Sequence, residues 1–154
     1  MTATVTVTVA SLRSGNAARA LGPVHLADLA DVLAALLLGR QVDAFAAEGH
    51  HLRGGDPWEP RSEPYGSRMT RIGFTKTLTI SGRLRASTRA EGAADADGIT
   101  IALHADTPYA RFHQHGTARM PARRVFEITE QDREFVRATA ERFIETALSA
   151  EGGT

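Results

Sequence analysis

Histidines and serines are the residues of this chain whose types and spacing could do chemistry. His50-His51 and the pair His113-x-His115 offer four imidazoles, which are enough ligands for a zinc ion. Adjacent histidines at a helix end point about 100° apart, whereas an i, i+2 pair on a strand shares one face, so only the second pair has usable geometry. No His-Glu-x-x-His spacing accompanies either pair. The sequence favours structural or surface roles for all six histidines, and we predict no metal site and no cofactor.

Hydrolytic chemistry finds no better support in the sequence. Ser62 and Ser81 both lack the Gly-x-Ser-x-Gly frame of a nucleophile motif. The spacing of Asp106 and His113 gives no reason to expect an acid–base pair. No Gly-x-x-x-x-Gly-Lys phosphate loop occurs either. We therefore predict that the protein is not an enzyme, and a small metal-dependent hydrolase using His113 and His115 is the least favoured alternative.

Size and composition set the broad class of the protein. The chain has 154 residues, which suits a single domain, and it has no cysteine, so it forms no disulfide. The first residues lack a basic segment followed by an apolar core, so no signal peptide is expected. The longest apolar run, residues 32–38, is far shorter than the roughly 20 residues that a membrane span needs. We expect a soluble protein of the cytoplasm with no membrane contact.

Charge is distributed unevenly although the net charge is zero. Residues 61–124 hold eleven Lys and Arg against five Asp and Glu, a balance of +6, whereas residues 125–154 hold three against seven, a balance of −4. Such polarity suits contact between a basic face of one copy and an acidic face of its neighbour, or a channel through which DNA passes without sequence-specific reading. A solvated surface with incidental clustering explains it equally well.

The N-terminal third predicts a strand and a long helix. Residues 4–9 alternate Thr and Val, which is the pattern of a half-buried strand. A helix is expected from about Pro23 to Glu48, with an apolar stripe opposite Asp28, Asp31 and Asp43 that consists of Leu26, Leu29, Leu33, Leu36 and Leu37. Glycine costs about 1 kcal/mol relative to Ala inside a helix, so we expect a kink or break at Gly39. Gly49 is expected to end the helix.

Residues 49–73 have little periodicity and are rich in Gly and Pro, which predicts a long, irregular, arm-like loop. The single tryptophan, Trp58, lies in its middle. Two interpretations stay open for this side chain. It folds back onto the core of its own subunit, or it anchors an interface, where tryptophan is favoured at hot spots.

The C-terminal half predicts short strands followed by a helix. The expected strands are residues 77–80, 84–89, 98–103 and 124–128, with a hairpin loop at 91–98 and a turn at 106–108. Residues 109–115 are predicted as an extended segment or a short helix. Thr129 caps a final helix over 130–150, with Asp132 at its third position in a weak capping box and an apolar stripe formed by Val136, Ala140, Phe143 and Ala147.

The predicted fold class is α+β. A small antiparallel sheet of about 4–5 strands is packed by a helix from the N-terminal half and by the C-terminal helix. The single domain, residues 1–154, divides into a strand and helix (1–48), the extended loop (49–73), a β-rich part (74–128) and the C-terminal helix (129–150).

The segment from Tyr109 to Arg123 combines a glycine turn with an arginine. Gly116 can adopt the positive φ of a tight turn. His113 and Gln114 carry hydrogen-bond donors and acceptors that can satisfy backbone groups at a strand edge. The guanidinium of Arg123 suits a carboxylate or carbonyls at a chain end. These residues either close the sheet and brace the last helix, which we expect for Tyr109 and Gly116, or contact another subunit.

Three motifs occur in an order that resembles the phage virion morphogenesis (tail completion) family of Mu-like contractile-tailed phages. They are Phe45-x-x-Glu48-Gly49 followed by Trp58-x-Pro60, then Leu78-x-x-Ser81-Gly82-x-Leu84-x-x-Ser87, then Tyr109-Ala-x-x-His-Gln-x-Gly116 followed by Pro121-Ala-Arg123. The matching pieces span about two-thirds of the chain. The sequence departs from the family at Gly54-Gly-Asp-Pro57, where Pro-x-Gly is usual, and at His115, where an apolar residue is expected.

The resemblance implies a structural virion protein, assembled in the host cytoplasm, that completes the tail or the head–tail joint as an oligomeric ring around the tail axis. A neck, head-closure or tail-terminator protein of a related connector fold is the alternative. The implied partners are copies of the same chain, other tail or neck proteins and DNA in the channel, contacted non-specifically. The candidate subunit-interface residues are Trp58, Tyr109, His113, Gln114, Gly116, Arg119, Arg123 and Arg124.

Overall fold

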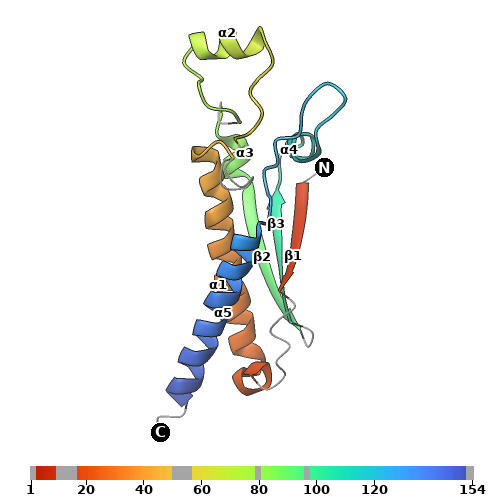
Figure 1. The fold of residues 1–154 in the computed structure, drawn as a ribbon. Helices are drawn as coiled ribbons and strands as arrows, with labels where there is room; N and C mark the ends of the chain where they lie inside the picture. Colours follow the sequence, from red (N-terminus) through yellow and green to blue (C-terminus); the bar gives the residue numbers. More distant parts are fainter. Residues whose placement is uncertain (1–2, 10–16, 50–56, 79–80, 96–97, 152–154) are drawn as a thin grey trace. The chain divides into compact units, whose positions relative to one another are not determined.

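The computed structural model describes residues 3–9, 17–49, 57–78, 81–95 and 98–151 (Figure 1). The elements, in chain order, are β1 (Ala3–Val9), α1 (Ala17–Ala46), α2 (Tyr65–Arg71), α3 (Arg83–Ala86), β2 (Thr88–Asp95), β3 (Gly98–Ala105), α4 (Ala110–His115) and α5 (Glu130–Glu151). The chain divides into two compact units. Unit 1 is Met1–Val5, Gly39–Arg89 and His104–Glu127, and unit 2 is Thr6–Leu38, Ala90–Leu103 and Ile128–Thr154.

The fold class is α+β with a small antiparallel sheet, as predicted, but the sheet has fewer strands than the predicted 4–5. In the described part of the chain it holds three strands in the order β1-β3-β2. The strand predicted at 84–89 is wrong over most of its length, because α3 precedes β2 there. Of the strand predicted at 77–80, Thr77 and Leu78 lie in a turn, and residues 79–80 fall outside the described residues.

The segments 124–128 and 91–98 also differ from their predicted structure. Residues 124–128 form no strand, because the N–H groups of Val125 and Phe126 donate to a side chain instead of to a neighbouring strand. The predicted loop at 91–98 is mostly strand, since β2 continues to Asp95. The low β-propensity of its Ala, Asp and Gly residues is overridden by pairing with β3.

Buried side chains of unit 2 come from α1, β3 and α5. Leu29, Leu33 and Leu37 of α1 are fully buried, whereas Leu36 of the predicted stripe is 40% exposed. Along β3, Ile99, Ile101 and Leu103 are buried and alternate with half-buried residues, so this face of the strand was predicted correctly. The helix α1 approaches β2 so closely that a Cβ at Gly92 would lie 2.2 Å from the carbonyl oxygen of Ala30.

Helix α1 begins earlier than predicted and does not break at Gly39. Its one residue with non-helical backbone angles is Gly22, at φ 70° and ψ 166°, just before Pro23. Proline suits the first turn of a helix, so Gly22-Pro23 marks the start of the main helical segment. Gly39 is exposed and remains helical. The intrinsic cost of glycine, about 1 kcal/mol, is therefore smaller than the cost of interrupting a buried helix at this point.

Helix α1 ends close to the predicted residue. Glu48 has φ 52° and Gly49 has φ 85°, and the N–H of Gly49 donates to the carbonyl of Ala44 at 2.9 Å. This i to i−5 bond with a left-handed residue before it is the pattern of a Schellman C-cap. A Cβ at Gly49 would lie 2.4 Å from Cδ1 of Trp58, so the glycine also makes room for the indole ring.

The segment 49–73 is not wholly irregular, since it contains helix α2. Residues 50–56, and with them part of the predicted loop, lie outside the described residues. Met69 of α2 is buried, and its carbonyl accepts a bond from the N–H of Phe74 at 2.9 Å. The side chain of Arg61 donates to the carbonyls of Phe74 and Lys76, which ties the start of the segment to the chain that follows α2.

Helix α5 begins with the predicted capping box. The N–H and hydroxyl of Thr129 donate to Oδ2 of Asp132 at 3.1 and 2.8 Å, and the N–H of Asp132 donates to Thr129 Oγ1 at 3.2 Å. Val136 and Ala140 are buried as predicted, but Ile144 is buried where Phe143 and Ala147 are only half-buried. Among the described residues, no helix is long and apolar enough to cross a membrane.

Candidate subunit-interaction site

The segment from Tyr109 to Arg123 folds as a short helix and a tight turn. Of the two predicted alternatives for residues 109–115, the short helix α4 is observed. Gly116 ends it at φ 73° and ψ 179°, and a Cβ there would lie 2.8 Å from the backbone nitrogen of Ala122. Thr117 and Met120 then form an isolated bridge. The glycine is therefore required both by its backbone angles and by the close return of the chain.

Gln114 connects α4 to the irregular segment at 124–128. Its Oε1 accepts the N–H groups of Val125 and Phe126 at 2.9 and 3.0 Å, and its Nε2 donates to the carbonyl of Phe126 at 2.7 Å. The side chain is buried, and so are Val125 and Phe126. One amide thus satisfies three buried backbone groups, which is the role predicted for Gln114, although the partner is an irregular segment and not a strand.

Arg123 connects the same segment to residues 59–60. Its Nε donates to the carbonyl of Glu59 and its Nη2 to the carbonyl of Pro60, both at 2.6 Å. The guanidinium group therefore binds carbonyls and not a carboxylate. The carbonyls belong to Glu59 and Pro60 in the middle of the chain and not to a chain end. Burial lowers the pKa of Arg123, an effect that the nearby Glu59 opposes and Arg61 reinforces.

Trp58 folds back onto its own subunit. The side chain is 3% exposed and packs edge-on against Phe45, with ring centroids 5.5 Å apart. Its Nε1 donates to the carbonyl of Arg124 at 2.9 Å. An indole that is buried with its N–H satisfied contributes to the core of unit 1. Three of the eight candidate interface residues, Trp58, Gln114 and Arg123, are thus buried in internal contacts.

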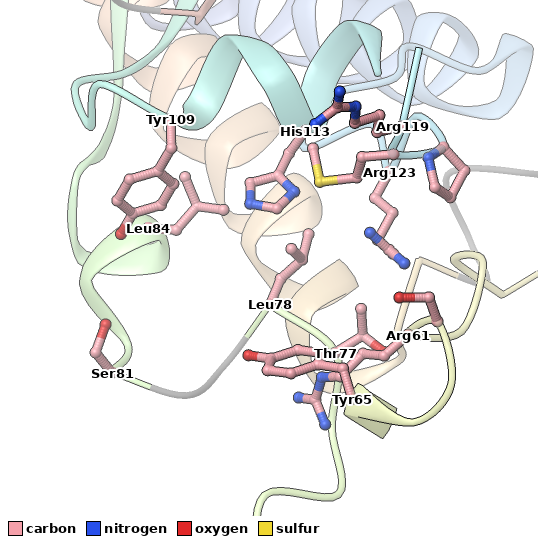
Figure 2. A pocket seen from close by; sticks show the side chains of 13 residues that line it. Arg61, Tyr65, Thr77, Leu78, Ser81, Leu84, Tyr109, His113, Arg119 and Arg123 are labelled. Atoms are coloured by element: carbon pink, nitrogen blue, oxygen red, sulfur yellow. The ribbon is translucent and has the colours of Figure 1, made fainter. Parts of the chain in front are cut away.

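A pocket with a volume of about 420 Å³ lies in unit 1, and Arg123 is one of the residues that line it (Figure 2). Its lining includes the apolar side chains of Leu78, Leu84, Met120 and Pro121 and the rings of Tyr65 and Tyr109. Three arginines, Arg61, Arg119 and Arg123, also line it, and none of the described residues that line it is acidic. We refer to it as the cationic pocket. Its volume and mixed lining fall within the range of sites that bind ligands or side chains.

His113 lies in the pocket wall between Tyr109 and Arg123 (Figure 2). Its ring meets that of Tyr109 edge-on at a centroid distance of 5.9 Å. Burial, and secondarily the charge of Arg123, lowers the pKa of His113. Its Nδ1 is buried without a hydrogen-bond partner in the described part of the chain. Both effects favour the neutral form of the imidazole, and its Nδ1 is a polar atom that no described residue uses.

The geometry of the histidines does not favour a metal. His113 and His115 lie two apart on a helix and not on a strand, so their side chains point away from each other. His50 and His51 fall outside the described residues. Within the residues that the structure describes, no group of three or more His, Cys, Asp or Glu could hold a metal ion.

The remaining candidates lie at or near the surface. Arg119 is exposed at the pocket, and Arg124 is exposed and pairs with Glu127 at 2.5 Å. Sequence reasoning missed Arg61, Tyr65 and the other pocket residues before Tyr109. The hydrogen bonds of Arg123 and Trp58 join this part of the chain to the segment from Tyr109 onward across more than 60 residues. A local sequence pattern cannot predict contacts over such a separation.

These features define a small α+β protein with buried, hydrogen-bonded motif residues next to a pocket lined by arginines. The family model for phage virion morphogenesis matches residues 10–145, which is most of the chain. The protein belongs to this family, so its role in a phage particle is structural or in assembly, and it is associated with the virion. Comparisons with curated proteins and with solved structures give no match.

Proposed function

We propose that this chain completes the phage tail or the head–tail joint, acting as one of several copies in a ring around the tail axis. The observation that carries the proposal is the family match over residues 10–145, which includes the cationic pocket and every motif residue. The buried motif residues support the proposal. Gln114, Arg123 and Trp58 form hydrogen bonds within the chain that hold together the backbone around the pocket.

The arginines of unit 1 support contact with other molecules. The guanidinium groups of Arg68, Arg71, Arg83, Arg85 and Arg119 have no ion-pair or hydrogen-bond partner among the described residues. Exposed cations that no described residue neutralises are available to acidic surfaces of neighbouring tail or neck proteins, and to DNA phosphates in a channel. The second of these contacts would be independent of DNA sequence.

Deletion of the gene in a phage-producing strain, with electron microscopy of the particles, tests the proposal. Filled heads beside unjoined or abnormally ended tails are expected, and a plasmid copy of the gene should restore joined particles. Normal tails beside heads that have lost their DNA would favour the neck or head-closure alternative. Intact, infectious particles would refute an essential role in assembly.

A further inference from the structure

A second surface of the chain complements the cationic pocket. The exposed side of α1 carries Asp28, Asp31, Val32, Ala35 and Leu36, which we call the α1 ridge. Their spacing, i, i+3, i+4, i+7 and i+8, places them on one face of the helix. Val32 and Leu36 are 41% and 40% exposed, so the ridge presents two branched aliphatic side chains to solvent. The opposite face of α1 is the buried leucine stripe.

The acidic residues of the ridge form no ion pair with any residue that the structure describes. Asp28 and Asp31 have no ion-pair or hydrogen-bond partner in the parts of the chain that the structure describes. Helix α5, which carries much of the acidic C-terminal segment, differs in this respect. Its Glu134 and Glu141 both pair with Arg137, at 2.6 and 3.6 Å. The ridge therefore combines exposed apolar surface with acidic groups that no described residue neutralises, whereas the glutamates Glu134 and Glu141 of α5 are paired.

The pocket has the converse chemistry. It offers apolar walls at Leu78, Leu84 and Met120, and its described lining residues include arginines but no carboxylate. Arg119 is exposed there, and its guanidinium has no partner among the described residues. An occupant that fits would carry aliphatic side chains next to carboxylates on a rigid element. The α1 ridge meets this description, and a helix laid into an apolar site through side chains four residues apart is a common mode of recognition.

We propose that the cationic pocket of one copy receives the α1 ridge of a second copy, with Val32 and Leu36 entering the pocket and Asp28 facing Arg119. The contact joins two different surfaces, so it is heterologous and passes from copy to copy, and it closes into a ring when the rotation between copies allows. This inference rests on the proposed function, because it names the contact that would build the ring.

Disulfide cross-linking tests the contact inside assembled particles. The chain contains no cysteine, so only introduced residues of this protein can cross-link with one another. Particles assembled from a Leu36→Cys/Met120→Cys double variant should give a ladder of oligomers on a non-reducing gel after mild oxidation. Each single variant should give no ladder, because the contact pairs unlike surfaces. A matched control carries Leu36→Cys with Leu148→Cys, another exposed leucine, on α5.

Charge reversal in the deletion strain gives an independent measurement. Arg119→Glu and Asp28→Lys should each lower the yield of infectious particles by about tenfold or more, because like charges would then face each other. The double variant restores the pairing with reversed signs and should return the yield to within about threefold of wild type. Arg142→Glu and Glu145→Lys, exposed residues of α5 outside the pocket and the ridge, should have effects of about twofold or less.

The outcomes separate this inference from the proposed function. If the deletion abolishes joined particles but the Leu36→Cys/Met120→Cys pair gives no ladder, the inferred contact is wrong and the proposed function stands. A ladder from the control pair only, or a double charge variant as defective as the singles, would also overturn the contact. If the deletion leaves particles intact, the proposed function fails, and the same cross-link on purified protein decides the contact by itself.

Discussion

Replacement of the buried Gln114 by Met should strongly destabilise the protein. Methionine has nearly the same size but cannot bond the N–H groups of Val125 and Phe126 or the carbonyl of Phe126, which now meet the amide within 3.0 Å. A buried backbone group left unsatisfied costs about 1–3 kcal/mol. With three such groups, and partial relief by relaxation and water entry, we expect a loss of roughly 3–6 kcal/mol in the free energy of unfolding.

Urea denaturation followed by tryptophan fluorescence and by far-ultraviolet circular dichroism measures this loss. Trp58 is the single tryptophan and is buried in unit 1, so its fluorescence reports on the unit that contains Gln114. Gln131→Met, an exposed position on α5, is the matched control and should change the unfolding free energy by about 0.5 kcal/mol or less. A Gln114→Met protein within about 1 kcal/mol of wild type would refute the assigned role of the amide.

Gln114→Glu refines the same argument through pH. A carboxylate can still accept from Val125 and Phe126, but it cannot donate to the carbonyl of Phe126, which lies 2.7 Å from the present donor. Burial and this carbonyl should raise the pKa of the new carboxyl group. The variant should therefore be least stable at neutral pH and regain stability relative to wild type as the pH is lowered and the carboxyl group becomes protonated. A difference from wild type that does not change with pH would contradict this.

Three further predictions concern unit 1 and helix α5. The pKa of His113 is lowered in the folded state, so its contribution to stability should be fully present above the unfolded pKa of about 6.5 and be lost as the pH falls toward the folded pKa. In urea titrations at several pH values, His113→Gln should reduce this dependence of stability on pH. The exposed control His115→Gln should leave it unchanged. Gly116→Ala should cost about 3 kcal/mol by denaturation, because its backbone angles are nearly confined to glycine. Asp132→Ala should cost about 1 kcal/mol by thermal unfolding, through loss of the capping box.

Periodicity in the sequence predicted the elements whose partners are nearby or regular. The alternation of residues 4–9 and 98–103 and the leucine spacing of α1 correspond to β1, β3 and the helix in the structure. The Thr129–Asp132 capping box was predicted because its whole mechanism lies within four residues. Leu36 was wrongly assigned to the buried stripe, since helical spacing shows which residues share a face but not how wide the buried face is.

Elements governed by contacts distant in sequence were not predicted. Residues 124–128 have the composition of a strand, but the side chain of Gln114 binds the backbone groups that a neighbouring strand would need. The cationic pocket likewise depends on Arg123 reaching the carbonyls of Glu59 and Pro60. Short-range patterns identified Arg123 as a hydrogen-bonding fork, and only the fold shows that its partners lie inside the same chain.

The burial of the motif residues also changes how an interface should be sought. Trp58, Gln114 and Arg123 were candidate interface residues, and each is buried and bonded within unit 1. A variant at any of them alters folding and assembly together, so a loss of particles would not identify a contact. Arg119 differs because it is exposed at the pocket. If the buried residues shape the pocket and the exposed ones bind a partner, variants such as Arg119→Glu should lose assembly but keep their stability. Variants of the buried residues should lose both. Matched denaturation and particle-yield measurements on both groups would detect this separation, and equal loss of stability in both groups would contradict it.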